Sequence, residues 1–251
     1  MDTELSRRFR AVLCRAEGAV NVGSCCRALK TMGFDALSLA DCPAFDEDTV
    51  RSYALASYGI YEKAERFASL EEALASATIA VGVSRRTGKK RKESLVLTDF
   101  AASYIGYQGS VAMVFGNERD GLSDRELSVC DVALHIPSSE LFPSLNLSHA
   151  VQVVFWELRR AELAASARLG AAMVPARAAH TESGAARSRT RARAKSIADK
   201  LQEAGFYKIA GRPESEAFLA ELMARAALSE AELDRFEGLF SKLAALEAQR
   251  G

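Results

Sequence analysis

The sequence predicts an α/β fold in which a parallel β-sheet is covered by helices on both faces. Short apolar runs alternate with stretches of helical period up to about residue 165, and strands and helices that alternate in this way form parallel sheets. Because parallel strands are buried on both faces, their sequences are expected to be short and apolar, as they are here. The chain has 251 residues, of which 49% are hydrophobic, so it is long enough for one large core and an appendage.

The expected elements follow one another along the chain without an internal repeat. Strands are expected at residues 11–14, 36–40, 78–83, 111–115 and 132–136, the last of these closing the set. Helices are expected at residues 25–32, 46–58, 70–77, about 98–107, 123–128 and 150–165. Gly33 is expected to end the first helix, and Ser123 to cap the helix that follows it.

The composition changes after about residue 165. Residues 166–194 are rich in Ala, Ser, Thr and Arg, so we expect a basic flexible linker between a domain at 1–165 and a helical extension at 195–251. In the extension, Ser229 and Glu232 have the spacing of a capping box. The apolar residues of the helix that follows are expected to fall on one face: Leu233, Phe236, Leu239, Phe240, Leu243 and Leu246.

The composition also excludes several classes of protein and site. No apolar run reaches about 18 residues, and Met1 to Arg10 lacks an apolar signal core, so neither a membrane span nor secretion is expected. The five cysteines include the adjacent Cys25 and Cys26 but no CxxC pair, which favours free thiols in the cytoplasm over a disulfide framework or a metal site. The formal net charge is zero, so only local charged patches can indicate a partner.

Three loops at the carboxyl ends of predicted strands are the candidates for a ligand site, since open α/β sheets bind ligands at that edge. They are Val83 to Arg86, Gly116 to Glu118, and Ser144 to Asn146. A glycine at position 116 lets the backbone approach a ligand closely. Ser144 is expected to cap the next helix, with Asn146 in its first turn. Neither GxGxxG nor GxxxxGK[S/T] is present, so a dinucleotide or P-loop site is not expected.

Arg27 and Glu118 each allow two interpretations from the residues alone. Arg27 is either a surface arginine with a packed stem, the commoner case, or a guanidinium at the ligand edge that binds phosphate or polarises a hydroxyl. Glu118 is either a solvated loop carboxylate or an organiser of the site beside Gly116. His135 and His149 are expected to pack or cap rather than to bind metal, and no nucleophile elbow supports Ser-His-Asp catalysis.

Three segments together resemble the motifs of one enzyme family. Asn21 to Gly33 resembles the first motif, N-x-G-x-x-x-R-x…G, of the SpoU/TrmH family of RNA 2′-O-ribose methyltransferases. Val114 to Leu122 resembles the second motif, and Ile136 to Ser148 resembles the third. The three motifs occur in the family's order and cover about residues 10–160, which makes the resemblance specific.

The resemblance implies a fold, a reaction and partners. The family belongs to the SPOUT class, whose active form is a homodimer and whose sheet ends in a C-terminal trefoil knot. Such a knot is an exception to the general rule that protein chains do not thread through their own loops. Lys30 to Gly33, Val81 to Ser84 and the C-terminal extension are similar to TrmJ-type enzymes, which use S-adenosylmethionine to methylate a pyrimidine ribose in the tRNA anticodon loop. The alternatives are a ribosomal-RNA 2′-O-methyltransferase of the same family and a non-catalytic RNA-binding member; the short segment before the first strand favours tRNA over rRNA.

The roles of individual residues also follow from the resemblance. Arg27 is expected to be the catalytic arginine, supported by Asn21, Glu118, Ser144 and Asn146. The S-adenosylmethionine pocket is expected to be lined by Val83, Ser84, Arg85, Gly116, Ile136, Ser144, Leu145 and Asn146, with a backbone contact from Ile136 to the adenine. The sulfonium methyl is already activated, so the protein mainly aligns the 2′-hydroxyl and removes its proton. Because a guanidinium keeps its proton at neutral pH, Arg27 is expected to stabilise the forming alkoxide.

Two basic clusters favour RNA, rather than DNA or a membrane, as the partner. Their members are Arg86, Lys89, Lys90, Arg91 and Lys92 in the first cluster, and Arg189, Arg191 and Arg193 in the second. Phosphate contacts from such clusters would supply salt-dependent affinity; the alternative is a solvated run of charge. Phe142 and Pro143 depart from the family's pattern before Ser144, which affects the choice of substrate more than the cofactor.

Overall fold

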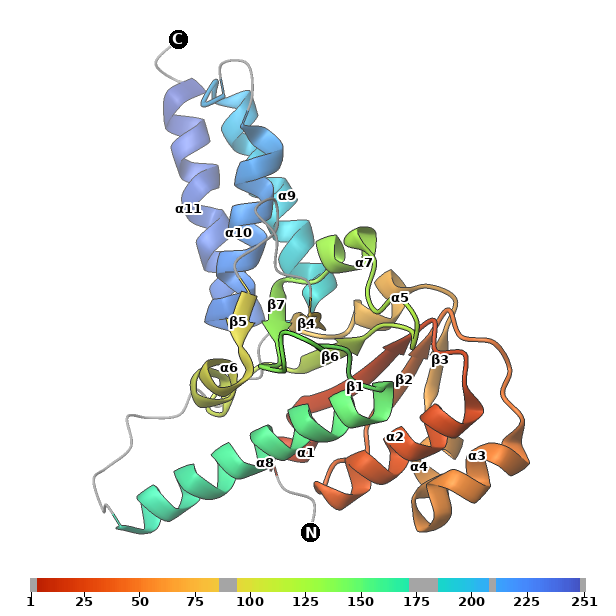
Figure 1. The fold of residues 1–251 in the computed structure, drawn as a ribbon. Coiled ribbons are helices and arrows are strands. Elements are labelled where there is room, and N and C mark those ends of the chain that lie inside the picture. The colour runs from red at the N-terminus through yellow and green to blue at the C-terminus, as the bar shows by residue number, and fades with distance from the viewer. Residues whose placement is uncertain (1–3, 86–93, 172–184, 208–210, 249–251) are drawn as a thin grey trace.

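A seven-stranded β-sheet is the centre of the fold in the computed structural model, which describes residues 4–85, 94–171, 185–207 and 211–248 (Figure 1). Its strands are β1 Phe9–Cys14, β2 Leu37–Ala40, β3 Glu65–Phe67, β4 Ile79–Val83, β5 Ser94–Val96, β6 Val111–Phe115 and β7 Val132–His135. Their order is β3-β2-β1-β6-β4-β7-β5, and every neighbouring pair is parallel. The predicted α/β fold with a parallel sheet is therefore confirmed.

The two edge strands, β3 and β5, are elements that the apolar pattern did not predict. Each has three residues and neither is a continuous apolar run. Glu65 and Arg66 of β3 are exposed, as an edge position allows, because an edge strand pairs on one side only. The interior strands agree with the predicted ranges to within two residues.

Helices cover both faces of the sheet because successive side chains of a strand point to opposite faces. They are α1 Glu4–Arg8, α2 Ala19–Thr31, α3 Glu47–Ala54, α4 Tyr58–Glu62, α5 Leu70–Leu74, α6 Leu97–Tyr104, α7 Asp124–Val129 and α8 Leu147–Ala171. Phe9, Ala11 and Leu13 of β1 join the larger core with α2, α6 and α8. Val12 and Cys14 join a core of smaller side chains with α5 and α7. Figure 1 shows α2 and α8 side by side on the larger core's face, where they are in contact.

The sequence predicted a helix that begins at residue 25, but α2 begins at Ala19. Residues 21–24, which were expected to precede the helix, therefore lie inside it. Glycine has a low intrinsic helix propensity, which made a helix through Gly23 unattractive from the sequence. Gly23 is required by packing: a Cβ there would lie 2.6 Å from the Val50 carbonyl oxygen of α3. The predicted end of α2 is confirmed, since Gly33 has φ +83° just beyond it.

The helix predicted at residues 46–58 is broken into shorter pieces. Asp46 caps α3 by accepting a hydrogen bond from the Thr49 N–H at 2.9 Å. A 3₁₀ turn, η1 Leu55–Ser57, then separates α3 from α4. Leu55 has φ +50°, and a residue in this left-handed region cannot continue a right-handed helix.

Three further helices form a C-terminal module with its own small core. They are α9 Arg187–Glu203, α10 Arg212–Ala226 and α11 Glu230–Ala248. The core contains Ile197, Leu219, Met223 and Leu233. Figure 1 shows the module standing beside the sheet, in light to dark blue. Among the helices of the described ranges, none is long and apolar enough to cross a membrane.

The predicted linker at residues 166–194 is helical at both of its described ends. Helix α8 continues through residue 171 and α9 begins at Arg187; residues 172–184 lie outside the described residues. Basic and small residues without an apolar period did not indicate these helical turns. The capping box is confirmed, since Ser229 N–H donates to Glu232 Oε2 at 2.8 Å. Only part of the predicted apolar face is covered, because Leu239, Leu243 and Leu246 are exposed.

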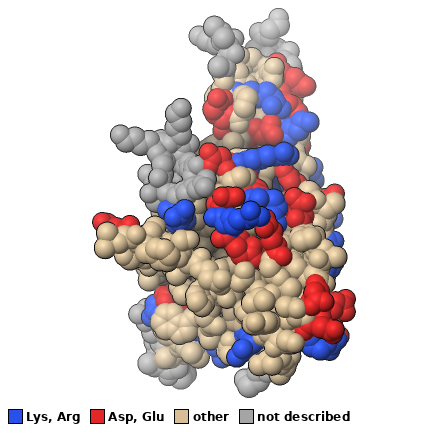
Figure 2. All heavy atoms as spheres, turned by 45° about the vertical axis from the view of Figure 1, so that its right-hand side comes forward, with Lys and Arg blue, Asp and Glu red and all other residues tan. Residues whose placement is uncertain are grey.

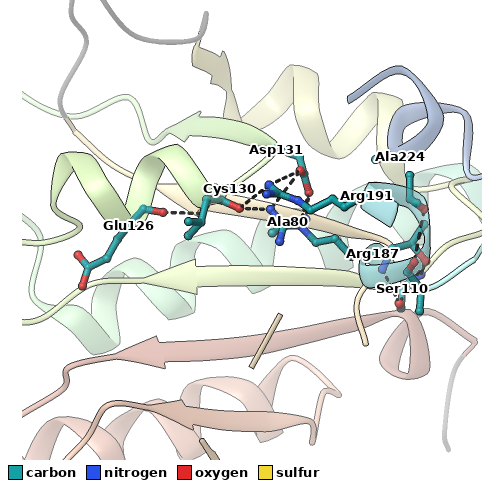
Figure 3. Close-up of polar contacts among 12 residues, drawn as sticks. Ala80, Ser110, Glu126, Cys130, Asp131, Arg187, Arg191 and Ala224 are labelled. Atoms are coloured by element: carbon teal, nitrogen blue, oxygen red, sulfur yellow. Dashed lines mark hydrogen bonds and ion pairs between the residues drawn. The ribbon is translucent and has the colours of Figure 1, made fainter. Parts of the chain in front are cut away.

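The module is anchored to the sheet by a buried ion pair between Arg187 and Asp131 (Figure 3). Arg187 Nε donates to Asp131 Oδ2 at 2.8 Å, and that oxygen also accepts the Ala80 N–H at 2.8 Å. The Arg187 N–H donates to the Ala77 carbonyl just before β4, and the Tyr107 hydroxyl donates to the Ala224 carbonyl of α10. These contacts lie at the amino ends of β4, β6 and β7. The module therefore packs on the end of the sheet opposite the candidate ligand loops.

Candidate functional site

One cavity lies at the carboxyl ends of three neighbouring strands, β6, β4 and β7. The loops that follow these strands meet there because the strands are adjacent and parallel. The cavity is lined by Val83, Ser84, Arg85, Phe115, Gly116, Asn117, Glu118, Arg119, Asp120, Gly121, Leu122, Ile136, Pro143, Ser144, Leu145, Leu147 and Ala150. The three candidate loops thus form a single site.

The cavity contains every predicted cofactor residue except Asn146. Its wall also includes residues outside the three candidate loops, notably Arg119, Asp120 and Leu122. Their position between Gly116 and the Ser123 cap was the signal available in the sequence, since the whole connection from β6 to α7 lines the cavity. Apolar side chains such as Ile136 and Leu147 share the wall with polar ones, so the cavity can hold a ligand that is partly apolar and partly charged.

The loop from Gly116 to Leu122 is folded tightly onto itself. Gly121 N–H donates to the Asn117 carbonyl at 3.0 Å, and Asp120 N–H donates to Asn117 Oδ1 at 2.8 Å. A Cβ at Gly116 would lie 2.0 Å from the carbonyl carbon of Gly121. Only glycine fits at position 116, and the backbone on both sides of it is consequently held at the cavity wall.

A polar network joins the predicted residues Asn21, Glu118 and Asn146. Asn21 Nδ2 donates to Glu118 Oε1 at 2.9 Å, and Asn146 Nδ2 donates to Asn21 Oδ1 at 3.0 Å. The Gly18 and Glu17 N–H groups also donate to the Glu118 carboxylate, at 3.1 and 3.2 Å. The network ties the start of α2, the β6–α7 loop and the start of α8 together at the edge of the cavity.

Glu118 is held as a carboxylate by this network. Burial alone raises the pKa of the Glu118 carboxyl, but hydrogen bonds from Asn21 and from the backbone of Glu17 and Gly18 oppose it, and the net pKa is lowered. An ionised carboxylate that already accepts three donors is poorly placed to take a proton from a substrate. The geometry therefore assigns Glu118 to the organisation of the loop rather than to proton transfer.

The start of α8 differs from the prediction, because Asn146 and not Ser144 caps the helix. Asn146 Oδ1 accepts the Ser148 N–H at 2.9 Å and its hydroxyl at 2.8 Å, and the Asn146 carbonyl accepts the Ala150 N–H. Ser144 lies two residues earlier, exposed on the cavity wall. Both residue types cap helices well, so the sequence did not distinguish them. The hydroxyl of Ser144 is thus left for a ligand, while Asn146 connects the cap to Asn21.

Arg27 does not line the cavity of its own chain. It is exposed on α2, six residues after Asn21, which places it about 9 Å along the helix and about 240° around it. Asn21 points to Glu118, so Arg27 faces away from that network. Val20 and Trp156, on α2 and α8, are also exposed, at 41% and 50%.

Of the two predicted basic clusters, the second lies within the residues that the structure describes. Arg86, Lys89, Lys90, Arg91 and Lys92 lie outside the described residues. In the second cluster, Arg189 pairs with Glu230 at 2.8 Å, Arg191 with Asp131 at 3.5 Å, and Arg193 with Glu237 at 2.7 Å. Figure 2 shows Lys and Arg side chains lying among Asp and Glu side chains on the face it presents. The arginines of the second cluster thus pair with acids of the same chain while their side chains stay partly exposed, and their contact with RNA stays a prediction.

Within the described residues, no three His, Cys, Asp or Glu side chains gather in a way that could hold a metal ion. The five cysteines are free thiols. Burial raises the pKa of the Cys26 thiol to about 12.

Comparison with known proteins identifies the family of the chain. The sequence model of the SpoU rRNA Methylase family matches residues 8–156. A protein described as an uncharacterized tRNA/rRNA methyltransferase of Haemophilus influenzae is 37% identical over 157 residues, which cover 62% of this chain and 64% of that protein. The tRNA (cytidine/uridine/adenosine-2′-O-)-methyltransferase TrmJ of Pseudomonas aeruginosa is 35% identical over 164 residues, covering 64% of each protein. The matched region thus spans less than two thirds of these relatives.

Solved structures extend the similarity to the C-terminal module. A probable methylase family protein from Haemophilus influenzae superposes with a TM-score of 0.64 and 27% identity, covering 97% of both chains. TrmJ from Z. mobilis shares the fold with a TM-score of 0.68, at 21% identity and with 93% of this chain covered. The cavity built by the three loops lies within the matched residues 8–156, and the chain belongs to the SpoU rRNA methylase family.

Proposed function

We propose that this chain transfers the methyl group of S-adenosylmethionine to the ribose 2′-hydroxyl of a pyrimidine in the anticodon loop of tRNA. The observation that carries the proposal is that the second and third family motifs line one cavity, and that Asn21 of the first motif is bonded to both of them through the Asn21–Glu118–Asn146 network. Support for tRNA comes from relatives whose names are tRNA 2′-O-methyltransferase TrmJ, at 35% and 34% identity.

The residues around the cavity fit the cofactor. S-Adenosylmethionine has an aromatic base, a ribose and a charged amino-acid end. Val83, Ile136 and Leu145 provide an apolar surface for the base, Ser84 and Ser144 offer hydroxyls, and Gly116, which has no side chain, lies in the cavity wall. When bound, the cofactor supplies an activated methyl group on sulfur.

The chain's own residues would then supply alignment and charge. The apolar wall excludes water from the reacting groups, and the fixed loop holds the ribose-binding edge in place. Glu118 keeps Asn21 oriented, and Asn21 in turn orients Asn146. Ser144, free of a capping role, can accept or donate a hydrogen bond at the cavity wall. The guanidinium of Arg27 would stabilise the negative charge that develops on the 2′-oxygen.

A homodimer would bring Arg27 to a cavity. Arg27 does not line the cavity of its own chain, so its proposed role requires a second surface to complete the site. The helix pair α2–α8 exposes Val20, Trp156 and Leu163, and apolar side chains at this level of exposure favour contact with another chain. We propose that two copies pair through this helix face.

The path of the chain from β7 to α8 is consistent with a knotted fold. We propose a trefoil knot around the segment from β7 to α8, supported by its path: β7 lies between β4 and β5, and α8 packs on α2, which follows β1 beyond β6. A cytoplasmic location is proposed because tRNA is processed there and the cysteines are free thiols.

Methyl transfer with labelled S-adenosylmethionine tests the function. Purified chain is incubated with total tRNA and, separately, with total rRNA, and the labelled nucleotide is mapped. Label at a pyrimidine ribose of the anticodon loop is expected. Label in rRNA alone would support the ribosomal-RNA alternative, and RNA binding without transfer would support the non-catalytic one.

Arg27→Ala tests the role of the arginine in the same assay. We expect a loss of at least ~100-fold in kcat, the size found when an oxyanion-stabilising group is removed. Arg51→Ala, an exposed helix arginine on α3, is the matched control. Normal turnover by Arg27→Ala would rule out the catalytic assignment while leaving the cofactor site intact.

A further inference from the structure

Arg15 lies outside the three motifs and contacts the loop Gly116–Leu122, called the cofactor loop below, without lining the cavity. It follows β1 directly and has φ +54°, a conformation that L side chains other than Asn and Asp rarely adopt. Its side chain is 32% exposed, and it does not line the cavity. A strained backbone conformation persists only where surrounding contacts maintain it, and such residues are frequent at functional sites.

The partner of Arg15 is Glu126 in α7. Arg15 Nε and Nη2 both donate to the Glu126 carboxylate, the latter at 3.0 Å, which is the two-pronged arrangement that arginine makes with carboxylates. Glu126 also accepts the Ser123 N–H at 2.6 Å, as the carboxylate of the capping box that starts α7. Its side chain is only 13% exposed. One carboxylate therefore fixes the arginine and the start of the helix after the cofactor loop.

The pair reaches the cofactor loop through Gly121. Arg15 Nη2 donates to the Gly121 carbonyl at 3.3 Å. Gly121 has φ +68° and lies against Gly116 at the turn of the loop, and both glycines line the cavity. The guanidinium thus bridges the end of β1, the turn of the loop and the start of α7.

Two carboxylates consequently tie the same two connections together. Glu118 accepts N–H groups of the β1–α2 connection from within the β6–α7 loop. Glu126 receives Arg15 of the β1–α2 connection from the far end of that loop. The first tie fixes Asn21 and the polar edge of the cavity, whereas the second supports the turn at Gly121, which forms part of the cavity wall. The two ties have separable consequences.

We propose that Arg15 and Glu126 are positioning residues for S-adenosylmethionine, because they hold the Gly116–Leu122 turn in the shape that forms the cavity wall. The inference rests on the proposed function and adds residues to it. Neither side chain touches the cavity, so the pair acts through Gly121 and the start of α7. Loss of the pair weakens cofactor binding and leaves RNA binding unchanged.

Calorimetric titration of S-adenosylmethionine into the full chain tests this. Arg15→Met keeps the length of the side chain and removes the fork, and we expect Kd to rise about tenfold, the effect of losing hydrogen bonds to a charged group. Arg15→Lys keeps the charge but cannot donate in two directions at once, so an intermediate rise is expected. Binding of total tRNA, followed by fluorescence anisotropy, is expected to change less than about twofold, since these are not phosphate contacts.

Arg10→Met is the matched control. Arg10 lies on β1 at the end far from Arg15, is partly buried, pairs with Glu65 at 3.8 Å and donates to the Ala73 carbonyl at 2.6 Å. It is expected to lower the melting temperature as much as Arg15→Met does and to leave cofactor Kd unchanged.

The measurements distinguish failure of the proposed function from failure of the positioning role of Arg15 and Glu126. If the wild-type chain does not bind S-adenosylmethionine, the proposed function fails. If it binds, and Arg15→Met and Arg15→Lys bind as tightly as wild type, the positioning role is overturned. Equal weakening by Arg10→Met and Arg15→Met would also overturn it, because the effect would then come from stability alone.

Discussion

At the scale of single residues, the polar edge of the cavity is fixed before a substrate arrives. Glu118 receives Asn21 and two backbone N–H groups, and Asn21 receives Asn146. Asn21 is bonded through both its amide nitrogen and its amide oxygen, and Asn146 through both of its own, so these side chains have little freedom to reorient. The site is accordingly suited to align the ribose of the proposed substrate rather than to adapt to it.

Glu118→Gln tests this arrangement. The amide carries an NH₂ group that cannot accept the N–H groups now bonded to the carboxylate, so the loop and Asn21 lose their alignment. We expect kcat for tRNA methylation to fall about tenfold, by the loss of charge-assisted hydrogen bonds. Glu62→Gln, on the exposed surface of α4, is the control in the same kinetic assay. Unchanged kcat in Glu118→Gln would contradict the role of the network.

The Glu126 carboxylate makes a pH-dependent contribution to stability. Burial raises its pKa, but hydrogen bonds from Arg15 and Ser123 outweigh burial and lower the pKa from 4.5 to about 2. Because the folded-state pKa lies below the unfolded value, the contribution is complete above pH 4.5 and is lost as the pH falls towards 2. Urea unfolding of wild type and Glu126→Gln is expected to differ at pH 6 and to converge in that window. A constant difference down to pH 2 would contradict this.

At the scale of elements, the contact between α2 and α3 depends on one missing side chain. Gly23→Ala would place a Cβ 2.6 Å from the Val50 carbonyl oxygen and 2.9 Å from the Tyr53 Cβ, so the helices must separate. We expect a loss of about 1–3 kcal/mol in the free energy of unfolding. Gly59→Ala in α4 has no atom closer than 4.0 Å and should gain about 0.5–1 kcal/mol from helix propensity. Chemical denaturation of both variants measures the contrast.

The elements also show where local pattern was sufficient and where it was not. The interior strands are buried on both faces, so their apolar runs marked them directly. The edge strands β3 and β5 are short and partly exposed, and nothing in their composition separates them from loop. At the start of α8, Ser144 and Asn146 are both good caps, and the choice between them depends on the bond from Asn146 to Asn21, 125 residues earlier.

At the scale of the whole molecule, the module and the sheet domain share a buried charge pair. Asp131 and Arg187 are each about 5% exposed, and the carboxylate also accepts a backbone N–H. Removing one member leaves the other buried without a counter-charge, which is costly. The relative placement of the two parts therefore depends on a single interaction more than on the rest of the interface's polar contacts.

Asp131→Asn is expected to lower the free energy of unfolding by about 3–5 kcal/mol and to release the module from the sheet. Urea unfolding and limited proteolysis between the sheet domain and α9 measure the two effects. Asp234→Asn is the control, because its pair with Arg193 is largely exposed and such pairs contribute about 0–1 kcal/mol. Equal proteolysis of the two variants would contradict the anchoring role.

The arginines of the second basic cluster pair with acids that lie far away in the sequence. Arg189 and Arg193 pair with acids of α11, and Arg187 and Arg191 pair with Asp131. The acids are distant in the sequence, so no local window contains both partners. The Arg15–Glu126 pair spans 111 residues and was invisible for the same reason, whereas the motif residues around the cavity could be found because each lies at a strand end.

During synthesis, Asp131 is made before its partner Arg187, and the delay follows from their separation in the sequence. Arg187 follows Asp131 by 56 residues, so at 5–20 residues per second the ribosome needs about 3–11 s to deliver it. During that interval the amino ends of β4 and β7 lack their cover and a carboxylate destined for burial faces solvent. A nascent chain halted before α9 thus carries an uncovered sheet end, and the carboxylate of Asp131 faces solvent until Arg187 arrives.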